Sequence, residues 1–254
     1  MDASARPSPA RSVKMRGMNR WSLAATSWLC ALSQSLAAGT HVDRPALAST
    51  SLPRCPDPGA QVVERFMNAD CTGCWSAPTG AHSPTREWLF DWIVPSAQGA
   101  DAPMSAAALA AAAERAARAK LTEPTRSMTT QIARSRLTQR GSLQLQVQSG
   151  PAWNGYFGLQ MSIRGQAPAG ATAWMALVEP LPIGIDGSGV ARELMRSVAG
   201  PLPLPDSTKP LSHLAAVRAP DSAQPERLRA RAWIEAADGR ILAVASDGCV
   251  ARMR

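Results

Sequence analysis

Lysine and histidine are scarce in this sequence of 254 residues, which carries a net charge of +8. There are three of each: Lys14, Lys120, Lys209, His41, His82 and His213. The basic charge therefore depends on arginine, and about half of it lies in the first 20 residues. The other arginines are spread along the chain with few aromatic residues among them. Because affinity for phosphate needs clustered cations, the sequence predicts no nucleic-acid partner.

The sequence also lacks the patterns that define several other classes of protein. It has no run of about 20 apolar residues, so no stable membrane span is expected once an export signal is removed. There is no Gly-x-Ser-x-Gly elbow, and Gly184-Ile-Asp-Gly-Ser-Gly189 lacks the glycine order of a dinucleotide site and predicts a tight loop. No cofactor is expected. An apolar fraction of 45% with 18% charged residues is typical of folded proteins and excludes wholesale disorder.

The first 37 residues have the three-part form of a secretory signal peptide. Cationic residues up to Arg20 are followed by an apolar segment from Trp21 to Leu32 and then by small residues. Ser35-Leu36-Ala37 is the preferred cleavage site, and residues 38–59 form a linker. The sequence therefore predicts a periplasmic or secreted protein, with an uncleaved amphipathic anchor as the alternative.

Removal of the signal peptide discards Cys30 and leaves four cysteines, Cys55, Cys71, Cys74 and Cys249. An even number of cysteines in an exported chain suggests that they are paired in disulfides. Cys71 and Cys74 are close enough in sequence to pair with each other. We therefore predict a structural bridge between Cys55 and Cys249 that ties together the two ends of the folded chain.

The segment over 60–140 has the pattern of an α/β unit. Residues 61–67 and 87–94 are apolar runs of strand length, and the second run ends at a proline. The alanine-rich residues 104–120 predict a helix, and residues 125–140 predict another that stops at Gly141.

Beyond residue 141 the hydrophobic pattern changes to the period of strands. Alternating segments and their turns predict a mainly antiparallel β domain over 141–254 with one short helix at 190–198. Its expected strands are 143–147, 157–163, 172–179, 228–236 and 240–245. Asn154-Gly155 has the composition of a hairpin turn between the first two of them. The predicted fold class is therefore α/β, with an N-terminal unit over 60–140 followed by this β-rich domain.

Cys71-Thr-Gly-Cys74 is the strongest candidate for chemistry because it follows a strand and precedes a possible helix start. Backbone N–H groups at such a position stabilise a thiolate. In this interpretation Cys71 attacks a disulfide of a partner, Cys74 resolves the mixed disulfide by closing the ring, and Trp75 lines the site. The expected partners are thiols or disulfides of envelope proteins.

Two other interpretations of the cysteine pair remain open. A ring closed between Cys71 and Cys74 could be purely structural, in which case the protein would be a non-catalytic envelope interaction module. A metal carrier would use the two thiols with His82 or Met67. Zinc would need two more ligands, and there is no second C-x-x-C in the chain, so no metal is assigned.

The run Val62-Val-Glu-Arg-Phe-Met-Asn-Ala-Asp-Cys-Thr-Gly-Cys-Trp75 resembles an uncharacterised family of secreted, thioredoxin-like bacterial proteins, a domain of unknown function. That family has a V-V-E-L-F-T strand followed by a G-C-S-S-C-P-P turn. The closing Asp238-Gly-Arg-Ile-Leu-Ala-Val-Ala is also similar to it. The resemblance implies a thioredoxin-like unit over 60–140 that is divergent and shortened. The family's Thr-Pro-Gln segment has its nearest match at Thr129-Thr-Gln131, which lacks the proline.

Overall fold

The computed structural model describes residues 55–56, 60–78, 83, 86–122, 124, 131–136 and 143–249, which all lie in one compact unit, Ser49–Arg254. The predicted signal peptide, most of the predicted linker and His82 lie outside the described residues.

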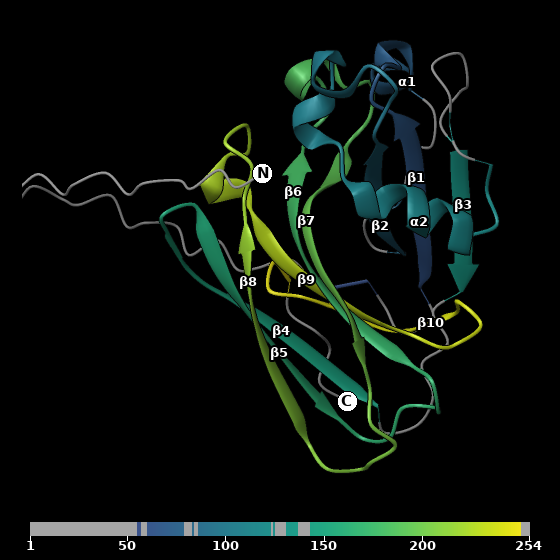
Figure 1. The fold of residues 1–254 in the computed structure, drawn as a ribbon, viewed down its shortest axis with the longest axis vertical. Helices are drawn as coiled ribbons and strands as arrows, with labels where there is room; N and C mark the ends of the chain where they lie inside the picture. Colours follow the sequence, from purple (N-terminus) through teal and green to yellow (C-terminus); the bar gives the residue numbers. More distant parts are fainter. Residues whose placement is uncertain are drawn as a thin grey trace, which may run out of the picture. The chain divides into compact units, whose positions relative to one another are not determined.

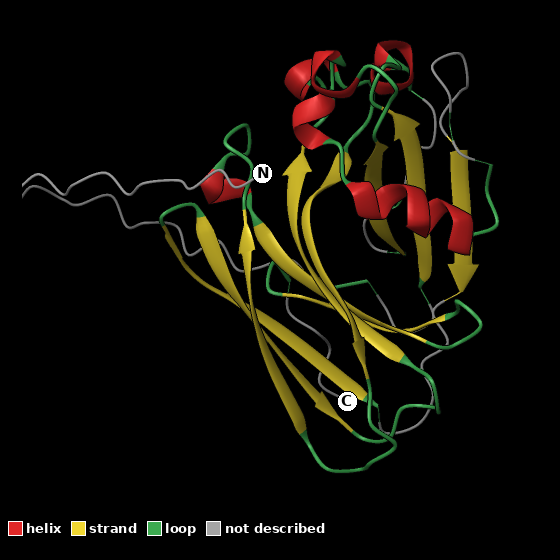
Figure 2. Ribbon diagram, in the orientation of Figure 1, coloured by secondary structure: helices red, strands yellow, loops and turns green. Residues whose placement is uncertain are grey.

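Strands dominate the described part of the chain (Figure 2). It contains the strands β1 (Gln61–Asn68), β2 (Glu87–Val94), β3 (Gln131–Arg136), β4 (Gln144–Trp153), β5 (Tyr156–Arg164), β6 (Thr172–Leu181), β7 (Arg192–Pro203), β8 (Leu211–Arg218), β9 (Arg229–Glu235) and β10 (Ile241–Ser246). The α-helices are α1 (Thr72–Ser76) and α2 (Ala110–Arg118). The short 3-10 helices are η1 (Gly99–Asp101), η2 (Ser105–Ala107), η3 (Ile185–Gly187) and η4 (Pro225–Arg227).

The strands form a seven-stranded sheet with the order β10-β9-β6-β7-β2-β1-β3 and a three-stranded sheet with the order β4-β5-β8 (Figure 1). In the larger sheet β2 is parallel to both β1 and β7, and the other pairs are antiparallel. The seven-stranded sheet is curled, and α2 lies against one of its faces (Figure 1).

This architecture corrects the predicted fold class. The part of the chain that the structure describes is mostly β, and the described residues within 60–140 do not form a thioredoxin-like α/β unit. Strands β1, β2 and β3 share one sheet with β6, β7, β9 and β10, because β7 lies between β6 and β2 and joins the two halves of the chain. The described residues supply one helix of more than five residues, α2, so helices cover too little of the sheet for an α/β layer structure.

Two predicted helices are wrong where the structure describes them. Residues 131–136 of the predicted helix 125–140 form β3, which pairs with β1, and the predicted helix 190–198 is largely β7. Both segments contain good helix formers, but pairing in the sheet overrides this preference. The predicted helix 104–120 is present in part, as η2 and α2. The strand β8 was not expected from the sequence.

Three hydrophobic clusters hold these elements together. The first fills the space between the three-stranded sheet and strands β6, β9 and β10. The second lies between α2 and the larger sheet and contains Trp88, Trp92, Trp174 and Trp233. The third lies at the carboxyl ends of β1 and β2 and includes the sulfur atoms of the C-x-x-C pair. Strands β1 and β2 are buried almost throughout, as expected for parallel strands that are covered on both faces.

An ion-pair group fixes α2 to the sheet. Arg115 of α2 donates to Glu64 on β1 at 2.7 Å and to Glu235 on β9 at 2.5 Å. Burial lowers the pKa of Arg115, but the two carboxylates outweigh it, and the net pKa is raised. The helix thus bridges two strands that are separated within the sheet by β2, β7 and β6.

Candidate functional site

The C-x-x-C motif follows the carboxyl end of β1. A tight turn leads out of the strand, in which the Asp70 N–H donates to Asn68 Oδ1 at 2.9 Å and the Cys71 N–H donates to the Asn68 carbonyl at 2.9 Å. Ser96, just beyond β2, donates to Asp70 Oδ1 at 2.9 Å. These bonds set where the first cysteine stands relative to the sheet.

Cys71 and Cys74 form a disulfide, with their Cα atoms 5.2 Å apart. Cys71 is the N-cap of α1, and its sulfur accepts the Cys74 N–H at 3.2 Å. The two cysteines are 8% and 5% exposed, whereas Thr72 and Gly73 between them are exposed. A Cβ atom placed on Gly73 would meet nothing within 4 Å. Both cysteines are thus buried, and the part of the disulfide ring that reaches the surface is formed by Thr72 and Gly73.

The helix after Cys71 is short. It ends at Ser76, and Ala77 is already extended. The loop at η3 closes against this end: the Gly189 N–H donates to the Trp75 carbonyl at 3.4 Å, and the Trp75 indole N–H donates to the Asp186 carbonyl at 2.7 Å. A Cβ on Gly189 would lie 2.1 Å from the Ser76 carbonyl oxygen, so only glycine fits there. The tight loop predicted over 184–189 is thus a wall of the site.

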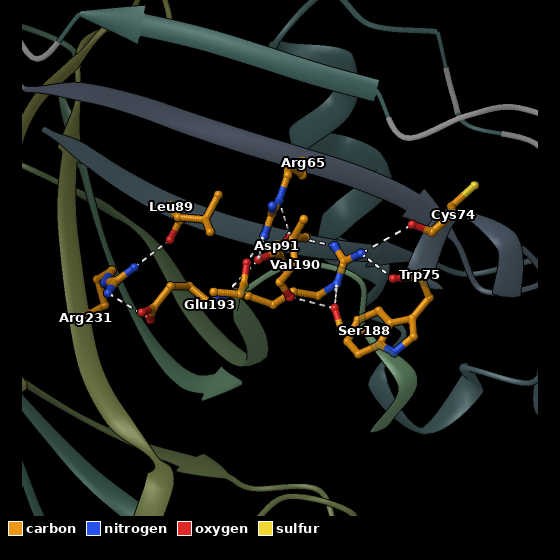
Figure 3. A network of polar contacts seen from close by, with 11 residues as sticks. Arg65, Cys74, Trp75, Leu89, Asp91, Ser188, Val190, Glu193 and Arg231 are labelled. Atoms are coloured by element: carbon orange, nitrogen blue, oxygen red, sulfur yellow. Dashed lines mark hydrogen bonds and ion pairs between the residues drawn. The ribbon is translucent and has the colours of Figure 1, made fainter. Parts of the chain in front are cut away.

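Arg192, the first residue of β7, forms hydrogen bonds to the carboxyl end of α1. Its guanidinium donates to the carbonyl oxygens of Cys74 at 3.2 Å and Trp75 at 2.7 Å, and to the Ser188 hydroxyl at 2.7 Å. It also lies 4.4 Å from the centre of the Trp75 ring. Figure 3 shows Cys74 with its carbonyl group turned toward this network and its sulfur turned away.

The fully buried Asp91 of β2 holds the other side of the network (Figure 3). It accepts from Arg65 at 2.6 and 2.7 Å, from Arg192 at 3.3 Å and from the backbone N–H of Glu193 at 2.7 Å. Burial lowers the pKa of Arg192, and the charge of Asp91 opposes that shift. Burial also raises the pKa of Glu193, although Arg231, which binds Glu193 at 3.1 Å, opposes the shift.

A cavity of about 700 Å³ opens beside the disulfide. Its walls come from α1, from the segment around η2, from the η3 loop and from β7. They are formed by Thr72, Gly73, Trp75, Ser76, Ile93, Pro103, Met104, Ala106, Ala107, Asp186, Gly187, Leu194, Arg196 and Ser222. Small-molecule and cofactor sites usually have volumes of about 300 to 1,000 Å³. The cavity is thus large enough for a ligand, and the two residues between the cysteines belong to it.

A second buried ion-pair group closes one end of this cavity. Arg196 donates to Glu179 of β6 at 2.7 Å, and Arg227 donates to the same carboxylate at 2.6 Å. The Arg196 side chain is 6% exposed and the Glu179 side chain is fully buried. A further Arg196 nitrogen, Nη1, lies 3.4 Å from the Ser222 hydroxyl. Two guanidinium groups therefore share one carboxylate at this end.

The predicted bridge between Cys55 and Cys249 is present, with a Cα separation of 5.0 Å. It lies away from the cavity and packs against the tryptophan cluster under α2. It joins the segment before β1 to the segment after β10, although β9, β6, β7 and β2 lie between those strands in the sheet.

The metal-carrier interpretation gains no support from the geometry. Met67 is fully buried, and within the described ranges no group of three or more histidine, cysteine, aspartate or glutamate side chains is placed to hold a metal ion.

Among the described residues, each helix falls short of the length and apolar character that crossing a membrane requires.

The sequence pointed to Cys71, Cys74 and Trp75, but it did not reveal Arg65, Asp91 or Arg192. These residues lie on three different strands and meet only when β1, β2 and β7 pair. A signal for them existed, because Arg65 and Asp91 each interrupt an apolar strand of the kind that is buried on both faces. A charge in such a strand requires a partner of opposite charge nearby.

Comparison of the chain with protein-family models, with curated proteins and with solved structures gives no match.

Proposed function

We propose that the protein is an exported thiol–disulfide exchange protein that reacts with protein partners through Cys71 and Cys74. The observation that carries this proposal is the position of the motif: Thr72 and Gly73, the exposed residues between the two cysteines, line a cavity. A purely structural staple has no need of an adjoining cavity. The second disulfide, between Cys55 and Cys249, is consistent with an oxidising compartment.

The hydrogen bond to the Cys71 sulfur supports the roles of the two cysteines. The Cys74 N–H is directed at Cys71 Sγ, and a donor in this position stabilises a thiolate once the pair is reduced. Cys71 is thus the cysteine whose thiolate is stabilised. It is therefore the sulfur that forms the mixed disulfide, and Cys74 is the one that resolves it.

The exchange is a reversible transfer of two electrons. A thiolate of the partner attacks Cys71 Sγ, the bond between Cys71 and Cys74 breaks, and Cys74 leaves as a thiolate that takes up a proton. A second thiolate of the partner then attacks the partner's sulfur atom that is bonded to Cys71, and Cys71 leaves as a thiolate. The partner gains a disulfide, and the protein retains two thiols. The reverse sequence reduces a disulfide of the partner.

Reduction of insulin by dithiothreitol, followed by turbidity, tests this proposal. We expect the parent protein to accelerate the reaction and the Cys71→Ser variant to reduce it to the uncatalysed rate, because the attacking sulfur is lost. The Cys74→Ser variant should accumulate a mixed disulfide that is visible by mass spectrometry, because no resolving thiol is present. The Cys55→Ser/Cys249→Ser variant is the control for loss of an unrelated disulfide and should retain activity.

A Cys71→Ser protein as active as the parent would overturn the proposal. In that case the pair is structural, and the alternative from the sequence, a non-catalytic interaction module, takes its place. Alkylation of the mildly reduced protein gives an independent result. Under the exchange proposal Cys71 should react with iodoacetamide faster than Cys55 at neutral pH, and equal rates would contradict it.

A further inference from the structure

We propose that the cavity beside the Cys71–Cys74 disulfide binds a cysteine-containing segment of a partner that carries an apolar residue followed by an acidic residue. This inference rests on the proposed function, because it assigns the substrate class to the same disulfide. The proposed function concerns the exchange reaction of the sulfur atoms, whereas this inference concerns binding of the partner segment that carries the reacting cysteine.

The apolar residue of the segment is placed by the walls next to the disulfide. Apolar surface is supplied there by four side chains, Trp75, Ile93, Met104 and Leu194. Trp75 directly follows the C-x-x-C turn, and Ile93 lies near the end of β2. Burial of apolar surface stabilises a complex by roughly 25 cal/mol for each Å² removed from water. A leucine or phenylalanine side chain adjacent to the reacting cysteine can enter this part of the cavity.

The acidic residue of the segment would bind at the part of the cavity wall that Arg196 forms. Arg196 and Arg227 share the single carboxylate of Glu179, so these three side chains carry one excess positive charge. The Nη1 atom of Arg196 has the exposed Ser222 hydroxyl at 3.4 Å, which is a long contact, and it lines the cavity. A carboxylate of the ligand would therefore complete the coordination of this guanidinium.

Asp186 is the one acidic side chain among the cavity residues, and it does not cancel this preference. It is exposed, and its carboxylate is screened by water and ions. Arg196 is almost completely buried, where charge interactions are screened much less. The charge of Arg196 is itself paired with the buried Glu179, and the excess positive charge that Arg196 shares with Arg227 favours an acidic segment over a basic one.

The volume of about 700 Å³ favours a peptide segment over a thiol of a few atoms. A ligand in this cavity lies against the η2 segment, where the exposed Ala106 forms part of the wall. A larger side chain at Ala106 reduces the space that the cavity offers. Ala100, which is exposed on the neighbouring η1, does not line the cavity and provides a matched control.

The test uses the Cys74→Ser protein, in which Cys71 is a free thiol, and peptides whose cysteine is joined to thionitrobenzoate. The Cys71 thiolate forms a bond to the peptide sulfur, the bond to thionitrobenzoate breaks, and the coloured thiolate leaves with the electron pair. The peptides contain Cys-Leu-Glu, Cys-Leu-Gln, Cys-Leu-Lys or Cys-Ala-Glu. Mercaptoethanol joined to thionitrobenzoate is the small probe with which each rate is compared.

We expect the Cys-Leu-Glu peptide to react about tenfold faster relative to the small probe than the lysine or alanine peptides do, the range expected when one apolar group is recognised. Ala106→Phe should abolish this preference, and Ala100→Phe should retain it. Equal relative rates for all peptides, together with normal release from the small probe, would overturn the inference while the proposed function stands.

A binding titration with a peptide that cannot exchange tests recognition of the segment separately from the proposed thiol–disulfide exchange. The parent protein should bind a Ser-Leu-Glu peptide, which cannot exchange, and Ala106→Phe should weaken this binding by about tenfold. If Cys71 releases thionitrobenzoate from no probe, the proposed function fails, and the titration alone decides whether the cavity recognises the segment. Absence of binding by the parent protein would overturn the inference whatever the chemistry of the sulfur atoms.

Discussion

Arg192 shows how a single side chain can determine the position of a reactive turn. An isolated helix of five residues is not stable in water, so α1 needs support from outside itself. Arg192 provides it by donating to two consecutive carbonyl groups at the end of that helix. The same guanidinium contacts Asp91, which binds Arg65, so the turn is linked to the middle of the sheet. The geometry at the disulfide therefore depends on buried residues of three strands.

Replacement of Arg192 by leucine tests this dependence. The change leaves the Cys74 and Trp75 carbonyls without this donor, which costs about 1 to 3 kcal/mol, whereas Asp91 keeps its pair with Arg65. The free energy of unfolding, measured by urea titration with circular dichroism, should fall by this amount. The exposed ion pair of Arg218 is the control, and Arg218→Leu should change the midpoint little. Equal effects of the two substitutions would contradict the assigned role.

At the scale of the secondary-structure elements, α2 closes the concave face of the larger sheet. Ala112 and Ala116 are almost fully buried against the tryptophan cluster, and their small size lets the helix approach the rings closely. Charge holds it in register, because Arg115 pairs with carboxylates from β1 and β9. The alanine-rich composition that predicted a helix from its propensity thus also satisfies a packing requirement.

Two leucine substitutions at neighbouring positions of α2 separate these effects. Ala116→Leu inserts a large side chain against the tryptophan cluster, and such overpacking costs about 1 to 3 kcal/mol. Ala117→Leu has similar helix propensity and an exposed side chain, and should change stability by less than about 0.5 kcal/mol. Thermal unfolding followed by near-ultraviolet circular dichroism gives both values. A stable Ala116→Leu protein would show that α2 is free to move away from the sheet.

The secondary structure was predictable where one local pattern acted alone. Alternation identified β4 and β5, the Asn154-Gly155 turn lies between them, and long apolar runs identified β1 and β2. Prediction failed at β3 and β7, whose residues prefer helix but gain partners in the sheet. Since β7 lies between β6 and β2, the error at this one strand also concealed the joining of the two halves into one sheet. Of the site, the cysteines were predictable from spacing, whereas Arg192 and the cavity depend on contacts between distant segments.

At the scale of the whole molecule, the two disulfides differ in the length of chain that they close. Cys55 and Cys249 are separated by 194 positions, and Cys71 and Cys74 by three. In the chain-entropy model, closure of the longer loop removes more freedom from the unfolded chain. The long bridge is therefore expected to contribute more to the free energy of unfolding than the short one.

Paired alanine variants test this division. Cys55→Ala/Cys249→Ala should lower the free energy of unfolding by about 2 to 5 kcal/mol, and Cys71→Ala/Cys74→Ala by about 2 kcal/mol or less, because the entropy term grows with loop length. Urea unfolding of both variants beside the parent protein measures the difference. A larger loss from the short ring would indicate that its role is structural and would weaken the exchange proposal.

The bridge between Cys55 and Cys249 also has a mechanical consequence. A tension applied through the backbone before Cys55 and after Cys249 passes directly across the sulfur–sulfur bond. The ten strands of the described residues lie inside the closed loop and carry none of that load. While this bond is intact, pulling on the two ends cannot peel a strand from either sheet, and cutting it exposes the hydrogen-bonded ladder to the full force.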